Sequence, residues 1–107
     1  MSDKATRKEI IASIEAWAEE NNFVVTFLGG SMGGTREDYA DAIVGTVDEP
    51  RPAIVYLRSA VIMALAEMSG GDVASAIEWY DYNIVRGLSY VKPKDGPPIL
   101  VDDVIPF

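Results

Sequence analysis

The chain has no cysteine and no histidine among its 107 residues. Without cysteine it can form no disulfide, no thiol nucleophile and no cysteine-ligated zinc site. Without histidine it lacks the commonest general base, the serine–histidine triad and every histidine-ligated metal site. Catalysis would have to rest on carboxylates, lysine, tyrosine or serine, and no pattern marks a nucleophile. We therefore expect a protein that is not an enzyme and that holds no cofactor.

Basic residues are scarce, because 9 Lys and Arg stand against 17 Asp and Glu, a net charge of −8 at pH 7. No segment is strongly basic, so binding to nucleic acid or to an anionic membrane surface is disfavoured. No apolar run approaches the ~18 residues of a membrane span, and the charged N-terminus is unlike a signal peptide. Hydrophobic residues make up 49% of the chain, enough for a core. We expect one cytoplasmic domain over residues 1–107.

Three segments carry apolar residues at helical spacing, which predicts helices. The first starts with a capping-box spacing at Thr6 and stops at Asn21-Asn22. The second, residues 58–68, is apolar on nearly all sides and is expected in the core. The third runs from an N-cap at Asp72 to a C′ residue at Gly87. The expected core stripes are Ile10, Ile11, Ile14, Trp17 and Ala18 in the first helix, and Val73, Ala76, Ile77, Tyr80 and Ile84 in the third.

Runs of β-branched and aromatic residues predict five strands. These strands are residues 23–28, 42–47, 53–57, 88–91 and 98–101. Turn-rich residues join the second strand to the third and the fourth to the fifth, which predicts two β-hairpins. Short connections between consecutive strands give an antiparallel sheet. The expected fold class is therefore α+β, with a small antiparallel sheet of three to five strands and two or three helices packed on it.

A glycine-rich run, Gly29-Gly30-Ser31-Met32-Gly33-Gly34, follows the first predicted strand. It lacks the Gly-Lys-Ser/Thr ending of a P-loop and the spacing of a dinucleotide fingerprint. We expect a mobile loop in the free protein, because four glycines lose much backbone entropy on ordering. The alternative is that its backbone N–H groups, with Ser31 and Thr35, bind an anion. Thr35 and Asp38 have cap-like spacing, which predicts that a short helical turn begins there.

Two carboxylates lie three residues apart in this turn, at Asp38 and Asp41. A helical turn would put both on one face, and such a pair can hold a hard cation such as Mg²⁺. The plainer interpretation is two solvated surface acids, and we expect no metal site. Both residues stay candidates for partner binding, because the acidic segment 37–49 could dock on a basic protein.

An aromatic element in the third helix is the stronger candidate site. Trp79 and Tyr82 are three residues apart on one stripe, Asn83 follows, and Arg86 lies four residues after Tyr82. Trp, Tyr and Arg are the residues enriched at interface hot spots, and aromatic rings also stack on bases. The competing interpretation is that the sheet or the first helix covers both rings.

Several segments share a pattern with known sequences. The residues that carry it are 39–45 (YADAIVG), 53–56 (AIVY), 74–84 (ASAIEWYDYNI), Gly87 and 96–99 (GPPI). With them the chain resembles a family of small uncharacterised phage and prophage proteins over roughly residues 39–100. The resemblance implies no activity and no catalytic residue. It implies a viral or prophage accessory protein that acts on a host system.

Three functions follow from these observations as competing hypotheses. The first is a non-enzymatic phage-type accessory protein that binds a host protein, and so antagonises host defence, through the Trp79–Tyr82–Arg86 face or the acidic residues 37–49. The second is a small-molecule protein that sequesters a nucleotide signal between the glycine-rich loop and the aromatic rings, at the interface of a homodimer. The third, and weakest, is a carboxylate–metal enzyme. Neither nucleic acid nor membrane is an expected partner.

Overall fold

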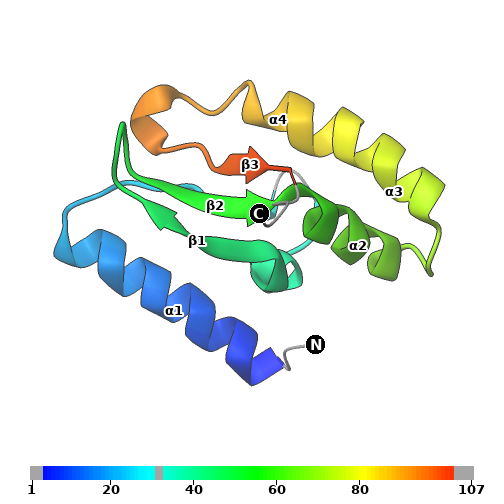
Figure 1. Cartoon of the computed structure of the whole chain (residues 1–107), viewed down its shortest axis with the longest axis horizontal. Helices are drawn as coiled ribbons and strands as arrows, with labels where there is room; N and C mark the ends of the chain where they lie inside the picture. The colour runs from blue at the N-terminus through cyan, green and yellow to red at the C-terminus, as the bar shows by residue number, and fades with distance from the viewer. Residues whose placement is uncertain (1–3, 31–32, 103–107) are drawn as a thin grey trace, which may run out of the picture.

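The computed structural model describes residues 4–30 and 33–102 (Figure 1). Its elements follow in the order α1 (Lys4–Glu20), η2 (Glu37–Ala42), β1 (Ile43–Val47), β2 (Ala53–Leu57), α2 (Arg58–Met68), α3 (Val73–Trp79), η3 (Tyr80–Val85), α4 (Arg86–Leu88), η4 (Pro93–Asp95) and β3 (Ile99–Val101). The last three helical segments before η4 run on without a break, and we call them together the α3–α4 helix. In Figure 1, α1 lies along the β1 edge of the sheet and the α3–α4 helix along the β3 edge. The α+β class is confirmed.

The three strands form one mixed sheet in the order β1-β2-β3. β1 and β2 form the predicted hairpin and pair antiparallel, with Ile43 opposite Tyr56. β2 and β3 pair in parallel, with Val55 opposite Ile99. The expected antiparallel direction is therefore wrong for β3. The reason is the connection. The chain leaves β2 through α2 and the α3–α4 helix, and a helical crossover brings it back to the same end of the sheet.

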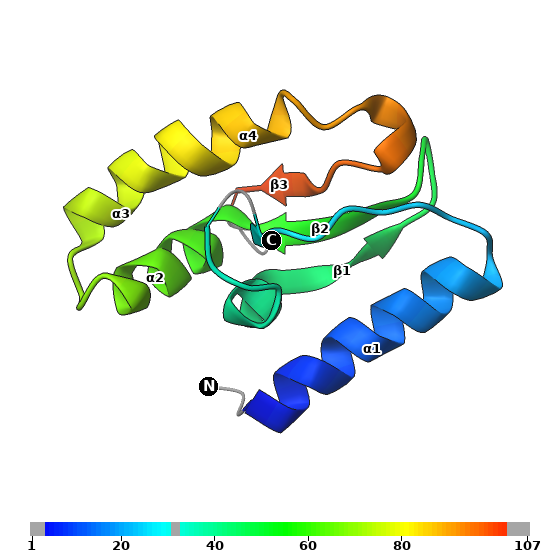
Figure 2. The same ribbon diagram turned by 180° about the vertical axis from the view of Figure 1, so that it is seen from behind.

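Two predicted strands are not strands in the described chain. Residues 23–28 are extended but cross the face of the sheet instead of joining its edge (Figure 2). Their backbone is bonded elsewhere: the Thr26 N–H donates to the Gly96 carbonyl at 2.9 Å, and the Leu28 N–H donates to the Tyr56 hydroxyl at 3.0 Å. Leu88 is the last residue of α4, and residues 89–91 turn after it, so the second predicted hairpin is also wrong.

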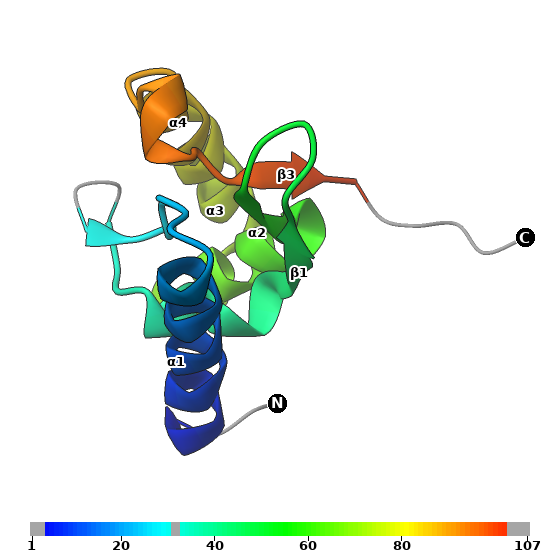
Figure 3. The same ribbon diagram turned by 90° about the vertical axis from the view of Figure 1, so that its left-hand side faces the viewer.

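The core lies where the helices and the extended segment 23–28 meet the sheet (Figure 3). The predicted stripe of α1 is confirmed, with Ile11, Ile14 and Ala18 buried. α2 is less enclosed than its composition predicts, because Met63 is 53% exposed and Met68 is 46% exposed. The largest fully buried side chains are Tyr39, Tyr56, Leu28, Ile54, Ile84 and Val61.

Local signals place two of the helix ends correctly and two others wrongly. α1 ends at the predicted asparagines: Asn22 is left-handed at φ 56°, and the Phe23 N–H reaches the Ala18 carbonyl at 2.8 Å, as in a Schellman motif. α1 begins at Lys4, so the predicted cap at Thr6 lies inside the helix. Gly87 is likewise inside α4 and not beyond it. α1 thus begins before its predicted cap, and α4 extends one residue beyond its predicted stop.

The N-cap of the α3–α4 helix is as predicted. The Asp72 carboxylate accepts hydrogen bonds from the Ser75 N–H at 3.1 Å and from the Ser75 hydroxyl at 2.7 Å. These bonds stabilise the charged form and hold the pKa of Asp72 below its ordinary value. The position at which the helix starts is therefore set by one aspartate.

The buried hydroxyl of Tyr56 predicts an alkaline loss of stability. Burial raises the pKa of Tyr56 to about 12, and its bond from the Leu28 N–H only partly opposes this. In the unfolded chain this tyrosine ionises near pH 10. The stabilisation that neutral Tyr56 gives to the folded state is therefore complete below pH 10 and is lost as the pH rises towards 12. We expect a loss of up to about 3 kcal/mol of unfolding free energy across that window.

Urea melts of the wild type and of Tyr56→Phe from pH 8 to 12 measure this loss. The variant should be less stable at pH 8 by about 1–3 kcal/mol, because the Leu28 N–H loses its partner. It should also show a shallower alkaline decline. Parallel declines in the two proteins would assign the effect to other groups.

Candidate functional site

The α3–α4 helix is exposed over most of its circumference. Its buried residues are Ala76, Tyr80 and Ile84, a single row at four-residue steps. Val73 and Ile77, predicted to belong to this row, are 45% and 41% exposed, so that part of the predicted core stripe is wrong. The helix lies at the edge of the sheet beside the three-residue strand β3, which is short and covers little of it (Figure 1).

The aromatic element predicted as a site lies on this helix and is not covered. Trp79 is 47% exposed and Tyr82 is 68% exposed, so neither the sheet nor α1 buries the two rings. The Arg86 guanidinium carbon lies 5.5 Å from the centroid of the Tyr82 ring, a cation–π contact. The Asn83 amide donates to the Trp79 carbonyl at 3.4 Å. The four predicted residues therefore form one group on one element.

A π-helical segment, η3 (Tyr80–Val85), occupies the middle of the helix, where the sequence predicts a regular α-helix. It contains Tyr82 and Asn83 and is flanked by Trp79 and Arg86. π-Helical turns are rare within α-helices and are frequent at functional sites. Hydrophobic spacing could not reveal it, because Tyr80 and Ile84 keep the four-residue spacing of a buried stripe.

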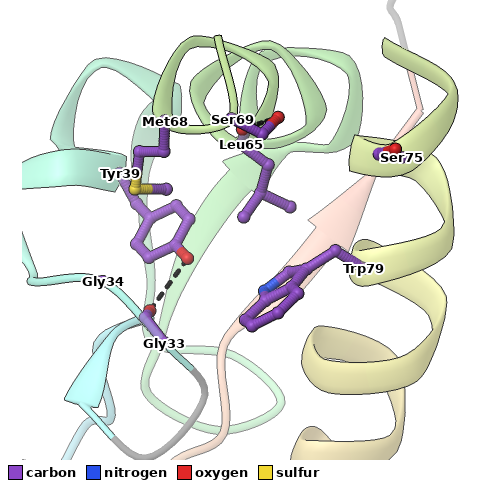
Figure 4. Close-up of a pocket in the computed structure, with 8 residues that line it drawn as sticks. All are labelled: Gly33, Gly34, Tyr39, Leu65, Met68, Ser69, Ser75 and Trp79. Carbon is purple, nitrogen blue, oxygen red and sulfur yellow. Dashed lines mark hydrogen bonds between the residues drawn. The ribbon is translucent and has the colours of Figure 1, made fainter. Parts of the chain in front are cut away.

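An apolar pocket of about 230 Å³ lies at the α3 end of this face (Figure 4). The buried side chains of Tyr39 and Leu65 form its inner wall, and Met68 and Trp79 stand half-exposed at its mouth. Gly33, Gly34, Ser69 and Ser75 complete the lining. Figure 4 shows the Trp79 ring, from α3, pointing towards the space between Tyr39 and Leu65. The pocket therefore brings together two regions that are far apart in the sequence, residues 33–39 and residues 65–79.

The glycine-rich run closes one side of this pocket. Gly33 has φ 94°, and a Cβ atom there would lie 2.9 Å from the Trp79 ring, so this close approach requires glycine. The Tyr39 hydroxyl donates to the Gly33 carbonyl at 2.9 Å, and burial, with Asp38 nearby, raises the pKa of Tyr39. The hydroxyl is therefore protonated at neutral pH, as the bond requires.

The anion-binding alternative for this run has little support in its backbone. The Gly30 N–H donates to the Gly34 carbonyl at 3.0 Å, and the Gly33 N–H donates to the Gly30 carbonyl at 2.9 Å. These N–H groups are thus used within the turn. Ser31, a predicted site residue, lies outside the described residues, and so does part of the predicted mobile loop.

A polar groove of about 650 Å³ lies at the other end of the same helix. Its lining comes from the extended segment 26–29 and from the helix end and the turn after it. The residues that line it are Thr26, Phe27, Gly29, Tyr82, Asn83, Arg86, Gly87, Tyr90 and Val91. Three of the predicted site residues therefore share a concave surface with Gly29 of the glycine-rich run.

The remaining predicted site residues lie elsewhere. The Thr35 N–H donates to the Asp38 carboxylate at 2.8 Å, which closes the predicted turn before η2. Asp41 forms an ion pair with Arg7 of α1 at 2.8 Å. The two carboxylates thus have separate partners, and no group of three or more acidic side chains within the described ranges could share a metal ion. The acidic residues Asp38 and Asp41 therefore lie apart from the aromatic group on the α3–α4 helix.

Some lining residues were not predicted. Leu65 and Met68 belong to a helix that the sequence assigns to the core, and Phe27 to a predicted strand. No local signal marks them, because their roles depend on which segments meet. Tyr90 is different, because it is 86% exposed. The sequence could have indicated it, since it is an isolated aromatic residue beside turn residues and outside any core stripe.

No single helix of the described chain is long and apolar enough to cross a membrane, although α2 and the α3–α4 helix, bent by 115°, pass that test as a pair by length and composition. Comparison with known proteins gives no relative. No family model, no curated protein and no solved structure matches the chain. The resemblance to phage proteins therefore stays a prediction, and function is argued from the geometry of the site.

Proposed function

We propose that the protein is a non-enzymatic protein-binding module whose docking surface is Trp79 and the apolar pocket beside it. The observation that carries the proposal is a tryptophan left 47% exposed at the mouth of a cavity with apolar walls. Exposed apolar surface beside a pocket is typical of interaction sites. The energetic centre of an interface is commonly an aromatic residue beside a well-packed pocket.

The pocket has the size for one apolar side chain of a partner. A dry cavity of about 150 Å³ holds a benzene ring, so about 230 Å³ accommodates a leucine or phenylalanine side chain. Burial of such a side chain against Tyr39, Leu65, Met68 and Trp79 would contribute about 1.5–3 kcal/mol. This is the size of contribution expected of a hot spot.

Charge supports a basic partner. The exposed residues Glu67, Glu78 and Asp81 lie on α2 and on the helix that carries Trp79, and the whole chain has a net charge of −8. Opposite charge around the docked side chain would speed association. The resemblance to phage and prophage proteins extends the proposal: the partner is a host protein in the cytoplasm, and binding antagonises a host defence. This extension rests on the resemblance alone.

Affinity capture from bacterial host lysate tests the proposal with three baits. The wild type should retain a partner that Trp79→Ala retains at least about tenfold less, because truncation of a hot spot costs more than 1.4 kcal/mol. Met63→Ala is the matched control, because Met63 is 53% exposed on α2 and does not line the pocket. It should capture as the wild type does.

Identical captured proteins with all three baits would contradict the proposal. Light scattering of the purified proteins separates a second possibility. If the wild type dimerises and Trp79→Ala does not, the partner of this surface is a second copy of the chain, and the host-protein assignment fails.

A further inference from the structure

We propose that the polar groove at the end of the α3–α4 helix binds a small anion that carries a planar aromatic ring, such as a mononucleotide. This goes beyond the proposed protein binding, because the groove and the apolar pocket share no lining residue. Its volume of about 650 Å³ lies within the range of small-molecule sites, about 300–1,000 Å³.

The groove has the charge that an anion needs, in a chain that is otherwise acidic. None of its described lining residues is acidic, and Arg86 is among them. Residues 81–95 carry three basic side chains, Arg86, Lys92 and Lys94, and two acidic ones, Asp81 and Asp95, whereas the whole chain has a net charge of −8. Arg86 takes part in none of the ion pairs formed between the described residues. Apart from its cation–π contact with Tyr82, its guanidinium donors therefore remain for an anionic ligand.

The groove also has the surface that a planar ring needs. Tyr82 and Tyr90 line it and are 68% and 86% exposed, and Phe27 lines it from segment 26–29. Contact with Arg86 orients the Tyr82 ring, and Arg36 lies 5.0 Å from the centroid of the Phe27 ring. Stacking on one aromatic side chain contributes about 1–3 kcal/mol per base. The rings and the guanidinium together match a ligand that has both a ring and a negative charge.

The backbone of the groove favours close approach of a ligand. Gly87 lines it from within a helix, where glycine is about 1 kcal/mol less favourable than alanine. Asn83, on the π-helical segment, adds an amide to the lining. A glycine and a π-helical turn are both unfavourable in an ordinary helix, and both lie at this groove. A binding site gives a reason for both.

Calorimetric titration of the purified protein tests the inference without any partner. The probes are adenosine 5′-monophosphate, adenosine and inorganic phosphate at equal ionic strength. We expect saturable binding of the monophosphate below millimolar concentration, and at least tenfold weaker binding of adenosine and of phosphate. If phosphate binds as tightly as the monophosphate, the ligand needs no ring. If adenosine binds as tightly as the monophosphate, the ligand needs no anion. Either result would overturn the inference. No binding of any probe at millimolar concentration would overturn the site.

Two variants place the ligand. Arg86→Gln and Tyr82→Leu should each weaken binding of the monophosphate at least tenfold while the thermal midpoint stays near that of the wild type, because both side chains are exposed. Lys8→Gln is the matched control, since it removes one exposed cation on α1, away from the groove. A loss in the control equal to that in Arg86→Gln would show non-specific attraction and overturn the assignment. The titration does not depend on the capture experiment. If Trp79→Ala captures the same proteins as the wild type, the proposed protein binding fails, but the ligand site in the groove does not.

Discussion

Replacement of Tyr80 with alanine is expected to lower the free energy of unfolding by about 3–5 kcal/mol, because it leaves a cavity in the core. The Tyr80 side chain is 3% exposed and belongs to the buried row of the α3–α4 helix, with Ala76 and Ile84. The Arg58 guanidinium carbon lies 5.4 Å from the centroid of its ring. Burial raises the pKa of its hydroxyl, with the nearby Arg58 acting in the opposite direction.

Tyr82→Ala is the matched control for this prediction, because it removes the same side chain two residues further along the same helix. Tyr82 is 68% exposed, so we expect a loss below about 1 kcal/mol. Trp79→Ala should fall between the two, because its ring is half-exposed and contacts Gly33. Urea melts of the three variants decide the matter. Equal large losses would mean that the aromatic group belongs to the core and is not an interaction surface.

Gly96→Ala is expected to be the second most damaging substitution, with a loss of about 3 kcal/mol. Gly96 has φ 64°, which a side chain strains, and its added Cβ would collide with the Val24 carbonyl oxygen. The Val25 Cα lies 3.0 Å from the same point. These neighbours are backbone atoms and cannot rotate away. The collision would push segment 23–28 off the turn before β3 and strain the bond from the Thr26 N–H to the Gly96 carbonyl.

Substitutions at two other glycines separate the cost of backbone strain from the cost of the Cβ collision. Gly70 has φ 78° at the end of α2 with open space around its Cβ position, so Gly70→Ala should cost only the strain, about 1–2 kcal/mol. Gly45 lies in β1 with open space and no positive φ, so Gly45→Ala should be neutral or slightly stabilising. Thermal and urea melts should therefore rank Gly96→Ala well above Gly70→Ala, and Gly70→Ala above Gly45→Ala. A loss in Gly96→Ala no larger than that in Gly70→Ala would argue against the packing of segment 23–28.

The sequence by itself determined the elements whose signals are local. α1 ends where Asn22 adopts the left-handed conformation, and the α3–α4 helix starts where Asp72 caps it. The β1–β2 hairpin follows from two β-branched runs with prolines between them. Each of these features depends on interactions within a few residues, so the residue types are sufficient to place it. The α+β class follows from their order.

Tertiary structure decided which of these elements meet. Residues 23–28 have strand composition, but the Tyr56 hydroxyl and the Gly96 carbonyl bind their N–H groups, so they cross the sheet instead of extending it. β3 is parallel because two helices separate it from β2. Both outcomes depend on partners more than 25 residues away, to which a pattern of hydrophobic and polar residues is blind.

The candidate site divides in the same way. The sequence by itself grouped Trp79, Tyr82, Asn83 and Arg86, because they lie within one helix and their spacing puts them close together. Of the surfaces that face them, it suggested only the glycine-rich run, whose Gly33 does approach Trp79. The pocket beside Trp79 needs Leu65 of α2 and Tyr39 of η2, and the groove beside Arg86 needs Phe27 of the crossing segment. A concave surface is formed by packing between segments distant in the chain, and its existence is therefore decided only when the chain has folded.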